Sequence, residues 1–210
     1  MNLIRLRQAE EAFLHRYPGG FDNPEIIAIR TKKHNVDKMI AFAQESFAKR
    51  NFKLPDQIIQ NMIKVVSRSS VISVFEKPRF RDFAETLSSK DRELLTSGLE
   101  ELLHGKEQIG FETILEMLKS SKLAKWSLMT VCQTYFHPQR AVLVKPTTVK
   151  GIIEYFELKN LQYKSTPTWA FYDAYRSTIY EMKSKVDQSL SPSNVAFSWF
   201  LLLSFHGKVF

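Results

Sequence analysis

The chain has 210 residues, of which 44% are hydrophobic and 25% charged, and its formal net charge is +8. This is ordinary globular composition, and a chain of this length buries roughly 70% of its unfolded surface, so the core needs no disulfide or metal. The single cysteine excludes a disulfide scaffold. The most apolar stretch, residues 195–205, is far shorter than the ~20 residues of a membrane-spanning helix.

Helical spacing of apolar residues runs through the first third of the chain. The pattern predicts helices over residues 3–17, 24–29, 36–47 and 55–66. Pro18-Gly19-Gly20 should end the first helix, because proline cannot continue a helix and glycine permits a left-handed exit. Asn23 and Asn35 are expected to cap the next two helices.

The middle of the chain carries one ambiguous segment among further helices. Residues 71–75 are rich in β-branched side chains and fit either a short strand or a buried helical turn. Ser88 and Asp91 match a capping box, and Gly105 is expected to follow the end of the helix that this box opens. Helices are also predicted over residues 80–87, 107–118 and 123–136.

The last third mixes one strand candidate with three helices. Ala141–Val144 is the best strand candidate, bounded by Pro138 and Pro146, and a short helix should follow over residues 149–156. Thr166 and Ser191 each precede a proline and are expected to cap the last two helices. In the first of these, Trp169, Tyr172 and Tyr175 form a stripe that is typical of a buried face.

These elements predict a mainly α protein, a compact multi-helix bundle with at most one or two short strands. Only seven glycines are present, too few for the special turns of an all-β chain. We expect a single helical domain over residues 1–210, with a subdomain boundary near residues 88–90 as the alternative.

The compartment follows from the cysteine and the N-terminus. Cys132 has no second cysteine to pair with, and its apolar neighbours predict a buried, inert thiol. Charged residues interrupt the first ten positions before any apolar run forms, which argues against a secretory signal. We therefore expect a cytoplasmic protein with no membrane segment.

The positive charge is concentrated in two segments. Residues 119–164 hold eight bases and two acids, and residues 30–53 hold seven bases and two acids. Phosphates bind such surfaces through salt-dependent attraction, so nucleic acid or another polyanion is the expected partner. The candidate binding residues are Lys122, Lys125, Arg140, Lys145 and Lys150. The alternative is a solvated surface that only keeps the protein in solution, and the sequence does not show whether the two segments share one face.

No catalytic motif is present. The chain lacks a glycine-rich phosphate loop, HExxH, paired CxxC and GxSxG. The five histidines are not spaced like a helical metal pair, so we expect no metal and no cofactor. His137, at a helix-to-strand turn beside Arg140, is the one candidate for proton transfer, with a structural hydrogen bond as the alternative.

Three further patterns each permit a functional interpretation. The triplets Glu157-Leu158-Lys159 and Glu181-Met182-Lys183 resemble part of a metal-dependent nuclease site, although both fall in or after helical runs. The helix after Lys145 could serve as a recognition helix, although residues 136–145 separate it from the preceding helix. The aromatic helix from Trp169 could stack bases instead of filling the core.

Residues 136–150, Phe-His-Pro-Gln-Arg-Ala-Val-Leu-Val-Lys-Pro-Thr-Thr-Val-Lys, followed by Tyr163, Trp169, Tyr172 and Tyr175, resemble uncharacterised bacterial helical proteins of unknown function. The resemblance covers the last third of the chain and implies a bacterial, intracellular protein. It transfers no activity.

Two hypotheses about function remain. The first is a non-enzymatic binding or interaction module with a basic surface that binds nucleic acid, and it is preferred because no catalytic motif is present. The alternative is an enzyme whose site is assembled around His137 and Arg140. Exposed aromatic residues leave a homodimer open as well.

Overall fold

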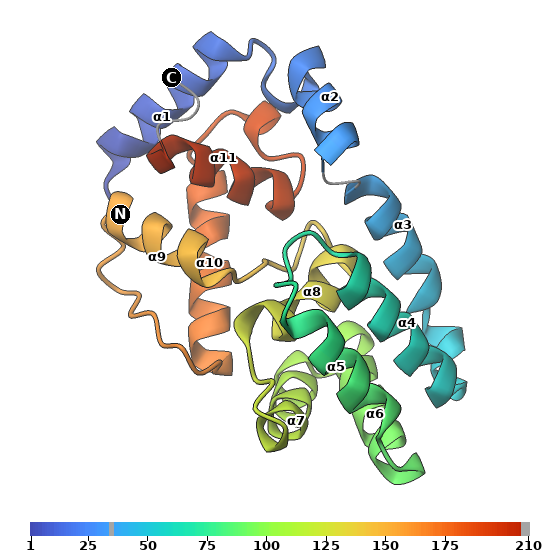
Figure 1. Ribbon diagram of the computed structural model, residues 1–210. Helices are drawn as coiled ribbons and strands as arrows, with labels where there is room; N and C mark the ends of the chain where they lie inside the picture. Colours follow the sequence, from blue (N-terminus) through green and yellow to red (C-terminus); the bar gives the residue numbers. More distant parts are fainter. Residues whose placement is uncertain (34–35, 207–210) are drawn as a thin grey trace.

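The computed structural model describes residues 1–33 and 36–206. Figure 1 shows a helical molecule in which short loops join most neighbouring elements. The predicted mainly α fold is confirmed. In the described ranges the elements are α1 (Leu3–Arg16), η1 (Gly20–Asp22), α2 (Pro24–Lys33), α3 (Val36–Ser46), η2 (Lys49–Lys53), α4 (Pro55–Arg68), α5 (Glu76–Glu85), α6 (Ser89–His104), α7 (Glu107–Ser120), α8 (Trp126–Phe136), α9 (Pro146–Tyr155), α10 (Trp169–Lys183), η3 (Gln188–Leu190) and α11 (Asn194–His206).

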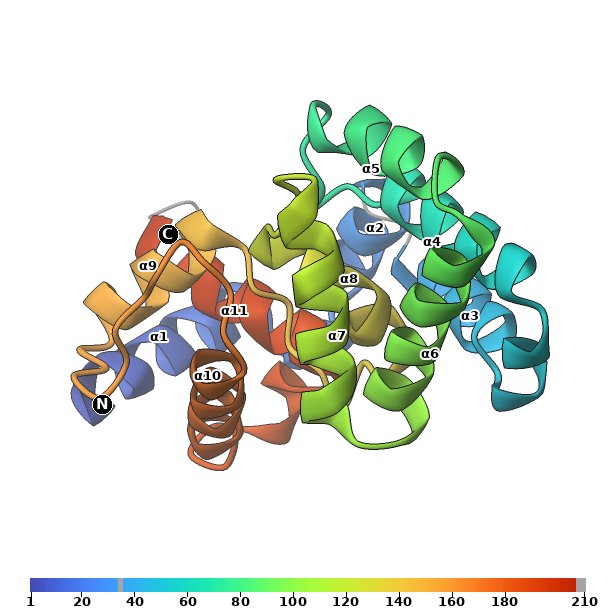
Figure 2. The same cartoon turned by 90° about the horizontal axis from the view of Figure 1, so that it is seen from below.

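Helix α8 lies at the centre of the molecule. Every residue of this helix from Trp126 to Tyr135 is buried, so no face of it reaches solvent. In both views α3 to α6 lie on one side of α8, and α1, α9, α10 and α11 lie on the other (Figures 1 and 2). A helix without a polar face can exist only in such a position, with partners all round it.

Two glycines let α6 and α7 cross closely. A Cβ atom at Gly110 would lie 2.2 Å from the backbone nitrogen of Leu102 and 2.5 Å from the carbonyl oxygen of Gly98. A Cβ atom at Gly98 would itself lie 3.0 Å from the side chain of Thr113. Only glycine at position 110 leaves room for the backbone of α6.

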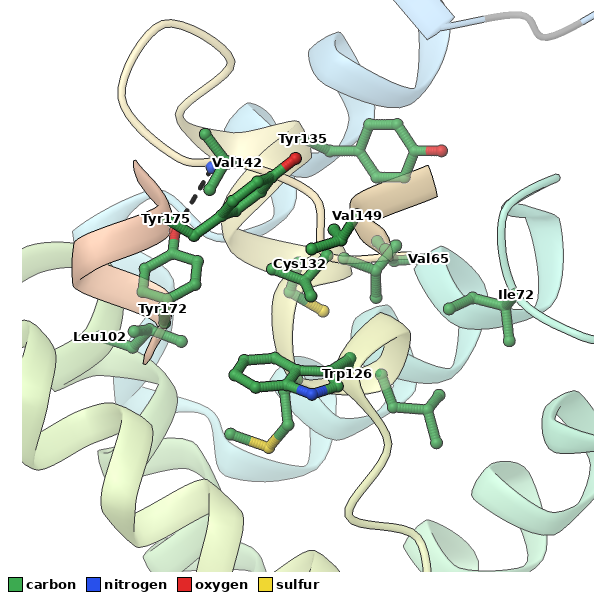
Figure 3. Packing of buried hydrophobic residues seen from close by; sticks show 14 of the residues in the cluster. Val65, Ile72, Leu102, Trp126, Cys132, Tyr135, Val142, Val149, Tyr172 and Tyr175 are labelled. Atoms are coloured by element: carbon green, nitrogen blue, oxygen red, sulfur yellow. Dashed lines mark hydrogen bonds between the residues drawn. The ribbon is translucent and has the colours of Figure 1, made fainter. Parts of the chain in front are cut away.

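The strand predicted at Ala141–Val144 does not form. The segment has no regular secondary structure, no strand pairs with it in the described chain, and side chains bind its backbone instead. The Val142 N–H donates to the Tyr172 hydroxyl at 3.3 Å (Figure 3), and the Val144 N–H donates to the Thr130 hydroxyl at 3.1 Å. The Asn194 amide donates to the Ala141 carbonyl at 3.1 Å. The apolar run between two prolines predicted a strand, but the partners of its backbone are side chains of helices.

Residues 71–75 form neither the short strand nor the helical turn that their composition allowed. They make an irregular turn between α4 and α5. Val74 and Phe75 are 71% and 79% exposed there, whereas Ile72 is buried. The β-branched residues Val71 and Ile72 therefore contact the core without forming a regular element.

Three of the predicted helix caps can be compared directly with the structure. The Ser88 hydroxyl accepts from the Asp91 N–H at 3.2 Å and opens α6, as predicted. The caps predicted at Thr166 and Ser191 are wrong, because Thr168 and Ser193 accept the first-turn N–H bonds instead. In both cases a second hydroxyl follows the proline, and the proline lies before the helix.

The N-terminal elements follow the prediction. Gly19 and Gly20 have φ values of 81° and 61°, the left-handed backbone that ends α1. The Asn23 side chain accepts from the Glu25 N–H at 3.0 Å at the start of α2. The cap predicted at Asn35 lies outside the described residues.

The buried apolar residues of the described chain form one continuous cluster that includes side chains from both sides of α8. Helix α5 precedes the loop at residues 86–88 in the sequence and α6 follows it, and both helices pack against α4. The division of the chain near residues 88–90 stays a prediction. Within the described ranges, no helix combines the length and the apolar character needed to cross a bilayer.

Candidate functional site

The candidate polyanion residues begin at the N-terminus of α8. Lys125 is the N-cap residue of this helix, and Lys122 lies three positions earlier in the turn from α7, with a φ value of 58°. Both side chains are exposed. The N-terminus of a helix carries a partial positive charge, so the lysines add to a field that already favours anions.

Two further lysines, Lys150 of α9 and Lys164 of the loop between α9 and α10, lie on segments near the start of α8. The indole N–H of Trp126 donates to the backbone carbonyl of Lys164 at 2.7 Å, which fixes this loop against the start of α8. The Lys150 ammonium lies 5.1 Å from the ring centroid of Tyr163, the residue before Lys164. We call Lys122, Lys125, Lys150 and Lys164 the lysine cluster.

Carboxylates lie near the lysine cluster without pairing with it: the Ser127 hydroxyl donates to Glu76 at 3.3 Å in the first turn of α8, and Glu154 lies four residues after Lys150 on α9. In the part of the chain that the structure describes, none of its four members makes an ion pair, and all four are exposed. Of the two acids in the basic segment 119–164, Glu157 is paired with Arg5 at 3.3 Å. Its charge is therefore partly neutralised by another residue.

Arg140 lies elsewhere. Its guanidinium pairs with Glu107 at 3.0 Å, and Glu107 is the first residue of α7. Lys122 follows the other end of α7, which has 14 residues and is therefore ~21 Å long. The structure thus brings three of the five candidate residues into the lysine cluster and places Arg140 about a helix length away.

Lys145 occupies a third position. It is the N-cap residue of α9 and lines a pocket beside α8 and α11. Val144, the residue before it, is held by Thr130 in the middle of α8. Lys145 is exposed but faces this pocket instead of the Tyr163 loop.

The second basic segment is separate from the lysine cluster. Lys49, Arg50 and Lys53 belong to η2 and line a shallow hollow together with Glu100. In both views η2 and the loop 156–168 lie on opposite sides of the molecule (Figures 1 and 2). The bases of η2 therefore do not share a face with the loop that carries Lys164.

His137 holds the end of α6. Its Nε2 atom lies 2.8 Å from the Leu103 carbonyl, so Nε2 donates and carries the ring proton. Burial is the main reason that the pKa of His137 falls below its usual value, and the nearby Arg140 charge lowers it further against the effect of the Leu103 bond. Since Leu103 lies in the last turn of α6, the bond satisfies a carbonyl that the helix leaves without a partner.

Glu107 joins Arg140 to α10. Arg176 on α10 pairs with Glu107 at 2.5 Å and with Asp173 at 2.8 Å, and its guanidinium lies 5.4 Å from the ring centroid of Tyr172. Burial alone would lower the pKa of Arg176, but the bonds with Glu107 and Asp173 outweigh it and leave that pKa raised. These contacts give His137 and Arg140 structural partners, and neither residue lines the pocket beside α8 and α11 that Lys145 lines.

Cys132 is confirmed as a buried residue. Its sulfur lies among the core side chains next to Trp126 and Val149 (Figure 3), and burial raises the pKa of the thiol to about 12. A thiol with that pKa is protonated at neutral pH and is a poor nucleophile.

The nuclease, recognition-helix and base-stacking interpretations find little support. Glu157 pairs with Arg5 and Lys183 binds Asn194, and in the described chain no group of three or more His, Cys, Asp or Glu side chains is arranged to hold a metal. The segment 137–145 separates α8 from α9, longer than the ~3–4-residue turn of a helix-turn-helix. In the aromatic helix, Tyr172 and Tyr175 are fully buried as their spacing predicted, whereas Trp169, the third residue of the stripe, is only partly buried against the core.

Comparisons with protein-family models, with curated proteins and with solved structures give no match to this chain.

Proposed function

We propose that the protein is a non-enzymatic binding module that contacts the phosphate backbone of nucleic acid through the lysine cluster. The observation that carries the proposal is the gathering of four lysines without carboxylate partners around Tyr163 and the start of α8. Each lysine that meets a phosphate releases condensed counterions, so such a surface binds without sequence preference.

The physical setting favours phosphates over isolated small anions. The lysines come from three segments, the turn before α8, helix α9 and the loop before α10, so their charges are spread along a surface. A chain of phosphates can meet several of them at once, whereas a single small anion meets one or two. A cytoplasmic location in a bacterium belongs to this proposal, since nucleic acid is abundant there and the lone cysteine needs no oxidising compartment.

The test is a salt series with labelled single-stranded DNA, duplex DNA and RNA, followed by fluorescence anisotropy. We expect binding at about 50 mM salt that weakens with a log–log slope of about −2 to −4, the value for three or four phosphate contacts. The Lys125→Glu/Lys164→Glu double variant should lose about 100-fold in affinity.

The matched control is Lys90→Glu/Lys185→Glu, which makes the same change in net charge at two exposed lysines outside both basic segments. This control should stay within about threefold of wild type at the same salt concentration, because only long-range attraction changes. Equal losses in the two double variants, or no binding at low salt, would refute the proposal.

A further inference from the structure

A pocket of about 220 Å³ lies between the two groups of helices. Its walls come from α11, α8, the start of α9 and the loop after α4, so residues far apart in the sequence meet there. Leu143, Val195, Leu202 and Trp199 contribute apolar surface to it. Small-molecule sites commonly have this character, a mostly apolar hollow between packed elements with a few polar groups.

The polar groups of the pocket are mostly hydroxyls that already have partners. The Tyr135 hydroxyl shares a hydrogen bond with Ser69 at 3.0 Å, and the Thr134 hydroxyl donates to the Thr130 carbonyl at 2.7 Å. The Ser193 hydroxyl accepts from the first turn of α11. The Ser198 hydroxyl differs, because it is buried without a hydrogen-bond partner in the described structure and can bond a polar atom of a ligand.

Lys145 differs from the hydroxyls because it carries a charge. It is the one charged residue among the described residues that line the pocket, and none of them carries a carboxylate. Lys145 makes no ion pair within the described chain, and it begins α9, whose N-terminal turn contributes Thr148 to the same wall. A ligand that fits this charge pattern has an apolar body and one anionic group.

The volume limits the size of the ligand. A cavity of ~150 Å³ holds benzene, so the present pocket suits roughly nine or ten non-hydrogen atoms. That is the size of a benzene ring with a short carboxylate arm. The Trp199 indole lines the pocket, so the benzene ring of a ligand can pack against it.

We propose that this pocket binds a small aromatic monocarboxylate, with its carboxylate at Lys145 and its ring beside Trp199. The proposal is independent of nucleic-acid binding, because Lys145 is not a member of the lysine cluster. The phenyl ring supplies the apolar contact, and the ammonium–carboxylate pair supplies the preference for an acid over a neutral analogue.

The probes are phenylacetate and its neutral analogue 2-phenylethanol, titrated into the full chain and followed by protein NMR shifts. Phenylacetate should bind at least about tenfold more tightly than 2-phenylethanol, since a charged hydrogen bond adds a factor of roughly 10–100. Lys145→Gln should remove that preference and leave the binding of 2-phenylethanol within about twofold. The control Lys159→Gln, at an exposed lysine outside the pocket, should change neither.

A pocket-filling substitution tests the location. Thr148→Phe should abolish binding of both probes, and Val195→Phe, at a lining residue of α11, serves if the first variant does not fold. Equal affinity for the acid and the alcohol, an unchanged preference in Lys145→Gln, or no binding of phenylacetate at millimolar concentration would overturn the proposal. The Lys125→Glu/Lys164→Glu variant should bind phenylacetate normally, so failure of one proposal is distinguishable from failure of the other.

Discussion

Two bases lie near each end of α7, but those at one end are paired with a carboxylate and those at the other end are not paired within the described ranges. At its first residue, Glu107 pairs with both Arg140 and Arg176, and the three side chains link α7, α10 and the loop after α8. Beyond its last residue, Lys122 and Lys125 have no carboxylate partner in the described chain. Two bases therefore link helices at one end, and two bases at the other are exposed without a carboxylate partner among the described residues.

The difference shows what a count of charges in the sequence leaves out. A base that faces a carboxylate has its field cancelled a few ångströms away, so it attracts little beyond its partner. Only the unpaired bases contribute to a binding surface. The comparison can be tested by removing the compensation at one end and the charge at the other.

The largest effect is expected from removing the shared acid. Glu107→Gln leaves two arginines without their common partner, and Arg176 has only 14% of its side chain exposed. We expect a loss of about 2–3 kcal/mol in the free energy of unfolding, less than for a fully buried pair because Arg140 reaches water. Urea denaturation measures it, with Glu112→Gln at an exposed position of α7 as the control. A loss below about 0.5 kcal/mol would mean that the Glu107 pairs do not stabilise this end.

The next effect separates two buried tyrosines on α10. The Tyr172 hydroxyl donates to Gln133 at 3.0 Å and accepts from Val142, whereas the Tyr175 hydroxyl has no hydrogen-bond partner in the described structure. Tyr172→Phe should cost about 1–2 kcal/mol, because it leaves two buried polar groups unpaired. Tyr175→Phe should be neutral or stabilising. Equal costs in thermal or urea denaturation would contradict the assigned bonds.

A smaller effect compares single cations at the two ends. Lys150→Gln should weaken nucleic-acid binding roughly three- to tenfold at low salt, about 1 kcal/mol, and should reduce the salt slope by about one phosphate contact. Arg140→Gln should change that affinity less than about twofold, since its charge is compensated. The same anisotropy assay measures both. A larger loss in Arg140→Gln would place the binding surface at the N-terminal end of α7 and contradict the proposal.

The smallest effect is a dependence on pH. Burial lowers the pKa of His137 in the folded chain. Below pH ~6.5, the usual pKa of histidine, the His137 ring is therefore protonated to a greater extent in the unfolded chain than in the folded chain. The stability that neutral His137 contributes is therefore complete above that pH and is lost as pH falls through the lowered pKa. Urea midpoints between about pH 7.5 and 5.5 should fall less steeply in His137→Gln than in wild type. Parallel profiles would show that His137 does not titrate with folding.

Local patterns predicted most of the fold. Helix positions and the Ser88 cap depend on residues within one or two turns, which the sequence displays directly. The Ala141–Val144 segment could not be predicted in the same way, because Tyr172 and Thr130, which bind its backbone, come from helices elsewhere in the chain. An extended backbone looks the same in sequence whether a strand or a set of side chains satisfies it.

The candidate site was predictable only in part. Lys122, Lys125 and Lys150 stand out as bases in a segment poor in acids, and the structure brings them together. Lys164 joins them through the indole bond of Trp126, a contact over 38 positions that no local pattern shows. Arg140 was grouped with the lysines because its partner Glu107 is distant in the sequence. The homodimer stays a prediction.

The way in which residues 141–144 are held has a consequence for the order of folding. A β-hairpin strand finds its partner within a few positions, but the amides of Val142 and Val144 have acceptors only after α10 and α8 have docked. Their hydrogen exchange therefore reports the assembly of the whole helical core and not the formation of any one helix. We expect these two amides to be protected as late as the slowest step of refolding.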